Sequence, residues 1–275
     1  MGGKLQIDKT FMIELAYGSA VGDALGVPYE FMPRGSFVCT GMTGYGTYNM
    51  PPGTWSDDTS MTIATCESIM WNKSIDLADI LSNFRNWLYN GAFTPTGYAF
   101  DKGSTTKEAV RSGKGLTSEW SKGNGSLMRI SPLAATDCTD DEIRAVSAIT
   151  HATDLCMDLC VDFVHMLRDV HKAPESAKET VDRYSHVAGK KRPEIESTGF
   201  VQHTYDAAAW CFVTTDTFED CIIEAVNLGN DTDTTACVAG ALAVACYGID
   251  AIPGEWVKGL RATYQIDEAL EPEAD

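Results

Sequence analysis

Apolar residues recur at helical spacing along most of the chain. In the clearest example, after Ser74, large apolar side chains repeat every three or four positions, which places them on one face of a helix. These positions are Leu77, Ile80, Leu81, Phe84, Trp87 and Leu88. The Asn90-Gly91 pair that follows is typical of a helix end. The pattern therefore predicts an amphipathic helix that follows Ser74 and stops at Asn90-Gly91.

Other segments have the same spacing. Thr139-Asp-Asp-Glu142 matches a capping box, in which both side chains satisfy free backbone N–H groups, and an amphipathic pattern follows it. Further helices are expected at about 8–24, 58–72, 154–171 and 204–214.

The segment Ala236–Cys246 is apolar on every side and consists of small residues, which is typical of a central helix packed against several neighbours. Sustained polar–apolar alternation is missing, so no sheet is predicted. The glycine- and proline-rich stretch 31–56 is too irregular for long helices. We therefore expect a single compact all-α domain over 1–275, with a core at about 10–265 and a frayed acidic tail at 267–275.

Composition narrows the class of partner. The chain has 275 residues, 44% of them hydrophobic, and its 39 acidic against 21 basic residues leave a formal net charge of −18. A chain with this charge lacks the basic surface that binds nucleic acid or an anionic membrane. The N-terminus has no signal-peptide pattern, and the longest uncharged apolar run, Ala236–Ile249, is too short to span a bilayer. A cytoplasmic, soluble protein is expected.

The nine cysteines are odd in number and lie mostly in apolar, helix-like runs, so they are predicted to be buried thiols rather than disulfides. No C-x-x-C pair occurs and only five histidines are present, which argues against a zinc site of cysteine and histidine.

Two carboxylate clusters stand at expected helix starts. They are Thr54-Trp-Ser-Asp-Asp-Thr-Ser60 and Asn230-Asp-Thr-Asp-Thr-Thr235. Helix capping by Ser, Asp and Thr would explain either cluster taken alone. The second cluster, however, directly precedes the most apolar helix, where buried acids need a compensating cation.

That cation is not a nearby side chain, because no Lys, Arg or His occurs between Trp210 and Gly254. Mg²⁺ and Mn²⁺ prefer the carboxylate and hydroxyl oxygens that both clusters offer. We therefore predict that one or two divalent ions are held by Ser56, Asp57, Asp58, Asp231, Asp233 and Thr234.

Four further features are candidates for chemistry. Glu30 follows a small-residue turn and precedes the irregular stretch, so a moving loop could carry it to a site and withdraw it. Asp101 lies just before a helix expected from near Ser104 and is either a cap or a functional acid. The turn Gly123-Asn-Gly-Ser-Leu-Met-Arg129 can present backbone N–H groups to phosphate, although a plain turn also explains it. His151 is structural unless its neighbours give it a role.

Taken together, five motifs resemble the ADP-ribosylglycohydrolase family, closest to its bacterial, dinitrogenase reductase-activating branch. They occur in family order over about residues 10–250. These motifs are Gly22-Asp-Ala-Leu-Gly-Val-Pro-Tyr-Glu30, Gly53-Thr-Trp-Ser-Asp-Asp-Thr-Ser-Met61, Gly123-Asn-Gly-Ser-Leu-Met-Arg129, Thr150-His151 and Ala225-Val-Asn-Leu-Gly-Asn-Asp-Thr-Asp-Thr-Thr235.

The resemblance implies an all-α fold with two Mg²⁺ or Mn²⁺ ions in a cleft, ligated by the six residues named above. It implies that Glu30 and Asp101 act in the reaction. The ADP-ribose pocket would be lined by Gly123, Asn124, Gly125, Ser126 and His151. In that comparison Ser104 and Phe200 stand near the substrate, at positions where bacterial relatives carry Asn and Tyr. These two differences are compatible with a different leaving group.

The implied activity is metal-dependent hydrolysis of the bond between ADP-ribose and a protein side chain, with arginine the expected side chain. The expected partner is an ADP-ribosylated protein or small molecule, and a monomer is favoured. Two alternatives are a non-catalytic ADP-ribose binder on the same fold and a di-metal phosphoesterase. The binder would be expected to have lost metal-site acids, but all six ligand positions are filled here, and the lack of histidines in both clusters disfavours the phosphoesterase.

Overall fold

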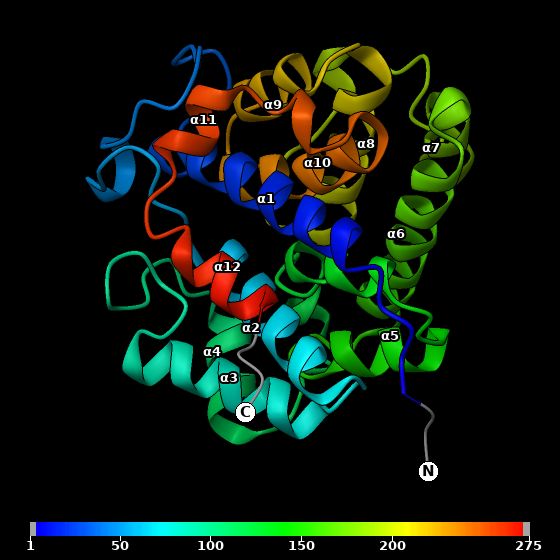
Figure 1. Cartoon of the computed structure of the whole chain (residues 1–275). Coiled ribbons are helices and arrows are strands. Elements are labelled where there is room, and N and C mark those ends of the chain that lie inside the picture. Colours follow the sequence, from blue (N-terminus) through cyan, green and yellow to red (C-terminus); the bar gives the residue numbers. More distant parts are fainter. Residues whose placement is uncertain (1–3, 272–275) are drawn as a thin grey trace.

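Twelve α-helices make up most of the chain in the computed structural model, which describes residues 4–271 (Figure 1). The helices are α1 (Lys9–Gly26), α2 (Asp57–Asn72), α3 (Leu77–Asn90), α4 (Ser104–Ser112), α5 (Asp140–Ala148), α6 (Asp154–Lys172), α7 (Ala177–Ser185), α8 (Val201–Thr214), α9 (Phe218–Asn227), α10 (Thr232–Tyr247), α11 (Gly254–Gly259) and α12 (Tyr264–Leu270). Over the described residues only isolated β-bridges occur. The predicted all-α fold is confirmed.

Local capping sets the ends of the helices that the apolar pattern predicted. The carboxylate of Asp76 accepts hydrogen bonds from the backbone of the first turn of α3, and Gly91 ends that helix with a φ of 71°. At α5, Thr139 and Glu142 form the predicted capping box. The helices expected near 8–24, 58–72, 154–171 and 204–214 are α1, α2, α6 and α8.

Four helices, α7, α9, α11 and α12, were not anticipated. They are short, and a helix of two or three turns repeats its apolar pattern too few times to stand out. The last of these helices, α12, corrects the prediction of a frayed tail that begins at Asp267. Asp267, where the frayed tail was expected to begin, lies inside α12, which buries Ile266, Ala269 and Leu270. Residues 272–275 of that expected tail lie outside the described residues.

The core is organised around α10, against which α1 packs closely along its length (Figure 1). Every residue of α10 from Thr232 to Ala245 is buried, as expected for a central helix. The two backbones approach so closely that a Cβ at Gly22 would overlap the carbonyl of Ala236. Gly18 and Gly240 face each other in the same way. Small residues therefore allow α1 and α10 to pack closely, and this contact brings Asp23 of α1 beside Asp233 at the start of α10.

The stretch 31–56 is irregular as predicted and contains one short 3₁₀ turn, Gly46–Tyr48. All nine cysteines are free thiols, and Cys246 alone is partly exposed, so the prediction of buried thiols is confirmed. Among the described helices, none combines the length and apolar character that crossing a membrane requires.

Candidate functional site

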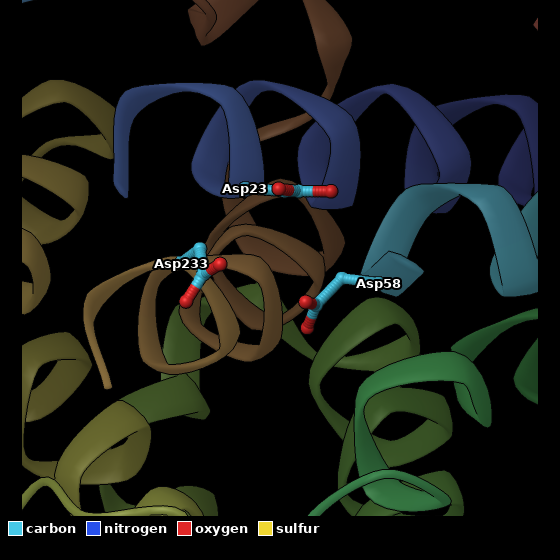
Figure 2. Close-up of side chains that lie close together, drawn as sticks. All are labelled: Asp23, Asp58 and Asp233. Carbon is cyan, nitrogen blue, oxygen red and sulfur yellow. The ribbon is translucent and has the colours of Figure 1, made fainter. Parts of the chain in front are cut away.

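Buried carboxylates from three helices converge beside the α1–α10 contact. Figure 2 shows Asp23 from α1, Asp58 from α2 and Asp233 from α10, which face a common space. One carboxylate oxygen of each lies within 4.8 Å of the others, and all three residues are buried. Carboxylate oxygens of a second group, Glu30, Asp231 and Asp233, likewise lie within 4.8 Å of one another. Asp233 belongs to both groups and so links them.

Helix capping does not account for the two acidic clusters. At α2 the cap is Ser56, whose Oγ accepts a hydrogen bond from the Asp58 backbone N–H at 3.3 Å. At α10 the N-cap residue is Asp231, but its side chain makes no capping hydrogen bond. The carboxylate of Asp58 instead accepts hydrogen bonds from Ser56 Oγ at 2.9 Å and from Thr234 Oγ1 at 3.4 Å. The two clusters thus contact each other, as predicted.

Asp23 differs from its neighbours because its carboxylate is saturated with donors. It accepts hydrogen bonds from the backbone N–H groups of Ser56 and Thr59 at 2.9–3.0 Å, and from Thr59 Oγ1 at 2.6 Å. Asp23 therefore holds the start of α2 against α1. One of its oxygens lies within 4.8 Å of oxygens of Asp58 and Asp233. Because its hydrogen-bonding capacity is already used, we interpret Asp23 as a positioning residue and not as a metal ligand.

Four other carboxyl oxygens at the site are buried and accept no hydrogen bond from the described residues. They are Glu30 Oε2, Asp58 Oδ1, Asp231 Oδ1 and Asp233 Oδ2. Within residues 4–271, no Lys, Arg or His forms an ion pair with any of these acids. Buried anionic oxygens without a partner are costly. An all-oxygen set of this kind suits a hard divalent cation.

Burial and mutual repulsion raise the pKa values of these carboxyls. The pKa values of Asp57, Asp58 and Asp233 lie well above the usual range, first because burial penalises the charged form and then because of neighbouring acids. Burial, together with the charge of Asp101, also raises the pKa of Glu30 to about 9. A cation bound by Asp57, Asp58 and Asp233 would lower the pKa values of these three carboxyls.

A cavity of about 300 Å³ opens beside the acids. Of the predicted site residues, those that line it are Glu30, Asp57, Asp101, Ser104, Gly123, Asn124, Gly125, His151, Asp231 and Thr234. Ser56, Asp58 and Asp233 lie buried next to this lining through the contacts described above. The structure thus gathers residues from segments that are far apart in the sequence.

Two predicted pocket residues do not line the cavity. Ser126 is fully buried behind it, where its hydroxyl accepts a hydrogen bond from Ser147 Oγ at 3.0 Å. Phe200 stands at the N-terminus of α8 and packs edge-on against His203, while its neighbour Gly199 lines the cavity. Both predictions followed from motif position, which does not tell which way a side chain points.

Sequence reasoning also missed several lining residues. Phe31 and Trp120 are exposed aromatic side chains at the cavity, 68% and 94% accessible. Isolated aromatic residues in loops give no periodic signal, so no pattern marked them. Thr106 from α4 and Met128 from the 3₁₀ turn Leu127–Arg129 also line the cavity without having been predicted. The same holds for Gly103, Thr105 and Gly199.

The glycine-rich turn is tied to the acids on one side and to His151 on the other. Asn124 Nδ2 donates hydrogen bonds to Asp231 Oδ2 at 2.9 Å and to Thr204 Oγ1 at 2.8 Å. A Cβ at Gly125 would lie 2.8 Å from Cε1 of His151, so only glycine permits this close approach. The turn therefore has a specific role in the site.

Glu30 is held in place more firmly than its loop position suggested. The Phe31 N–H donates to the Asn230 carbonyl at 2.6 Å, and the Asn230 N–H donates to the Met32 carbonyl at 2.8 Å. Thr47 Oγ1 donates to the Glu30 carbonyl at 2.6 Å. These bonds join the Glu30 segment to the segment that carries Asp231.

Asp101 is not a helix cap. The N-cap of α4 is Gly103, and Asp101 has a φ of 43°, in the left-handed region. Burial, and the nearby charges of Asp101 and Glu30, raise the pKa of the Tyr48 phenol. Both predicted acids thus line the same cavity.

Comparison with known proteins gives a consistent result. A family model described as ADP-ribosylglycohydrolase matches residues 12–274. The ADP-ribosylarginine hydrolase Tri1 of Serratia proteamaculans is 30% identical, over 92% of this chain and 76% of that protein. The ADP-ribosyl-[dinitrogen reductase] glycohydrolase of Rhodospirillum rubrum is 32% identical, over 88% of this chain and 87% of its own length. A solved structure titled ADP-ribosylglycohydrolase-related protein complex superposes with a TM-score of 0.79 and 28% identity, over 95% and 96% of the two chains.

Proposed function

Since the chain belongs to the ADP-ribosylglycohydrolase family, we propose that it hydrolyses the bond between C1″ of the distal ribose of ADP-ribose and a protein side chain. The observation that carries this proposal is the cavity where unpartnered carboxyl oxygens from the Glu30 segment and α10 meet the glycine-rich turn. Such hydrolysis builds positive, oxocarbenium-like charge at the anomeric carbon, and a carboxylate-lined cavity stabilises that charge.

Arginine is the side chain that we propose as the leaving group. The support comes from the names of two relatives, an ADP-ribosylarginine hydrolase and an ADP-ribosyl-[dinitrogen reductase] glycohydrolase. Ser104 lines the cavity, so it is the residue at which preference for another side chain would first be tested.

We propose two divalent cations, Mg²⁺ or Mn²⁺, as cofactors. The residues that would hold them are Ser56, Asp57, Asp58, Asp231, Asp233 and Thr234. The support is the all-oxygen donor set and the three aspartate oxygens without a partner, on Asp58, Asp231 and Asp233. When bound, such ions lower the pKa of a coordinated water and orient hydroxyl groups of the substrate.

The chain itself supplies two groups for proton transfer, Glu30 and Asp101. A carboxyl that keeps its proton near neutral pH can donate it to the leaving nitrogen, and one that has lost it can accept a proton from water. The raised pKa of Glu30 favours the donor role for that residue. Asn124 donates a hydrogen bond to Asp231 and so orients that carboxylate.

One assay tests this proposal against its alternatives. The purified chain is incubated with peptides that carry ADP-ribosyl-arginine or ADP-ribosyl-serine, and with p-nitrophenyl phosphate, each in Mg²⁺, Mn²⁺ or EDTA. We expect release of free ADP-ribose from the arginine peptide in metal and none in EDTA. Tight ADP-ribose binding without turnover would support a non-catalytic binder, and hydrolysis of the phosphate ester would support a phosphoesterase. Full activity in EDTA would rule out the metal-dependent reaction.

A further inference from the structure

Arg129 is a buried cation to which the proposed reaction assigns no role. Its side chain is fully inaccessible and stacks on the ring of Phe84 at 4.6 Å. Nη2 donates hydrogen bonds to the Val146 carbonyl at 3.2 Å and to Thr150 Oγ1 at 2.8 Å. Within residues 4–271, Nε and Nη1 have no partner and no carboxylate pairs with the guanidinium. A buried arginine without an acid is rare enough to require a reason.

Thr150 connects this arginine to the substrate cavity. Its Oγ1 accepts the hydrogen bond from Arg129 and lies 2.9 Å from His151 Nδ1. Arginine can only donate, so the hydroxyl of Thr150 must direct its own proton to another atom. Among the described residues, the acceptor within reach is His151 Nδ1. Thr150 is fully buried, and water therefore offers no alternative. Nδ1 must then be the unprotonated nitrogen of the ring.

The other nitrogen of His151 faces the cavity. His151 lines the cavity, and a Cβ at Gly123 would lie 3.5 Å from Nε2. Nε2 makes no hydrogen bond to the part of the chain that the structure describes, and it is not fully enclosed. Burial and the charge of Arg129 lower the pKa of His151 to about 3. The carboxyls of Glu30, Asp57, Asp101 and Asp231 line the same cavity, but none is hydrogen-bonded to the imidazole.

We infer that Arg129, acting through Thr150, is a positioning residue that fixes His151 as a neutral imidazole presenting Nε2–H to an acceptor oxygen of ADP-ribose. This inference rests on the proposed function only for the identity of the ligand. It assigns His151 to hydrogen-bond donation and leaves proton transfer to Glu30 and Asp101. The oxygen it meets belongs to the diphosphate or to a ribose, and both accept a hydrogen bond in the same way.

The first test reads the tautomer directly. Histidine ¹⁵N spectra of the full, unliganded chain are recorded between pH 5.5 and 8, and the His151 signals are identified as those lost in His151→Gln. We expect a neutral ring with its proton on Nε2 at every pH. A proton on Nδ1, or titration of His151 within this range, would overturn the inference. Neither result depends on whether the chain hydrolyses ADP-ribosyl bonds.

The second test removes the connection. Thr150→Val keeps the shape of the side chain but deletes the hydroxyl, and Thr150→Ser restores it. By calorimetry we expect Thr150→Val to weaken ADP-ribose binding about ten-fold, as for one lost hydrogen bond, and Thr150→Ser to recover most of that loss. In turnover the effect should be in KM rather than kcat. Unchanged tautomer and affinity in Thr150→Val would contradict the inference, and if that variant does not fold, the wild-type spectra still decide.

Discussion

The side-chain amide of Asn124 donates a hydrogen bond to Oδ2 of Asp231 across 2.9 Å and joins the glycine-rich turn to the start of α10. The bond occupies one carboxylate oxygen of Asp231 and leaves Oδ1 without a partner. Orientation of this kind is what a partner outside the metal shell provides to a ligand.

Asn124→Leu should therefore weaken divalent-metal binding without removing any proposed ligand. We expect an increase in the Kd for Mn²⁺ of about 10- to 100-fold, the usual effect of losing such a partner, measured by calorimetry. Thr204→Val is the matched control, since it removes the other acceptor of the Asn124 amide but leaves the bond to Asp231 intact. Equal metal affinity in wild type and Asn124→Leu would show that Asp231 needs no orientation.

Asp23 and Asp233 should respond in opposite ways to the same substitution. Asp233→Asn removes a buried carboxyl whose pKa is raised by burial and by neighbouring acids, so it should raise the melting temperature of the metal-free chain at pH 8. It should also abolish Mn²⁺ binding and turnover. Asp23→Asn places an NH₂ group against donors from Ser56 and Thr59, and should cost about 2–3 kcal/mol of unfolding free energy.

Thermal denaturation in EDTA and calorimetry with Mn²⁺ check both variants. Asp57→Asn is a further ligand variant and should behave like Asp233→Asn, because its pKa is raised for the same reasons. If Asp233→Asn melted below wild type in EDTA, the carboxyls would not repel one another in the empty site. If Asp23→Asn left stability unchanged, its hydrogen bonds would not hold α2.

The metal-free chain should lose stability as the pH rises. Asp23 and Glu30 have folded-state pKa values of about 6 and 9, above their ordinary values of 3.8 and 4.5. The folded chain therefore binds these protons more tightly than the unfolded chain does. The stabilisation is complete below the ordinary values and is lost as the pH rises through the raised ones.

Melting temperatures in EDTA should accordingly fall between pH 4.5 and 9, and saturating Mn²⁺ should flatten the curve because the cation compensates the carboxylates. Asp233→Asn in EDTA is the control, and should show a shallower fall than wild type. A metal-free curve that rises over this interval would contradict the raised pKa values.

The sequence predicted those parts of the fold whose signals are local. Thr139 and Glu142 stand three residues apart, and Ala236–Cys246 is one continuous run, so both can be recognised without knowing what they touch. The small helix α12 lacked such a signal, because its stability comes from burying Ile266 and Leu270 against distant segments. The frayed tail expected from Asp267 onward was inferred only from the acidic composition of that segment.

The site residues likewise include some with a local sequence signal and some without one. Asp57 and Asp231 stand in dense acidic clusters, which made them visible in the sequence. Asp23 is a single acid within a helix, and its partners Ser56 and Thr59 are 33 and 36 residues away. Phe200 was expected in the pocket from its motif position, but the start of α8 directs its ring to His203. Side-chain direction depends on the tertiary fold and not on local sequence.

The two acids at the cavity can be separated by matched variants. Glu30 is buried with a pKa raised to about 9, so Glu30→Gln removes a proton that the folded site holds at neutral pH, whereas Asp101→Asn removes a less buried carboxyl that lines the same cavity. If Glu30 protonates the leaving group, Glu30→Gln should lower kcat for an ADP-ribosyl-arginine peptide about 10²- to 10⁴-fold, the usual range for a general acid.

A substrate with a better leaving group, such as a p-nitrophenyl ADP-ribose, should recover most of the kcat lost in Glu30→Gln, because its leaving group needs no proton. Asp101→Asn should show no such recovery. The reverse pattern would assign the proton to Asp101, and Mn²⁺ calorimetry on both variants shows whether either loss comes instead from metal binding.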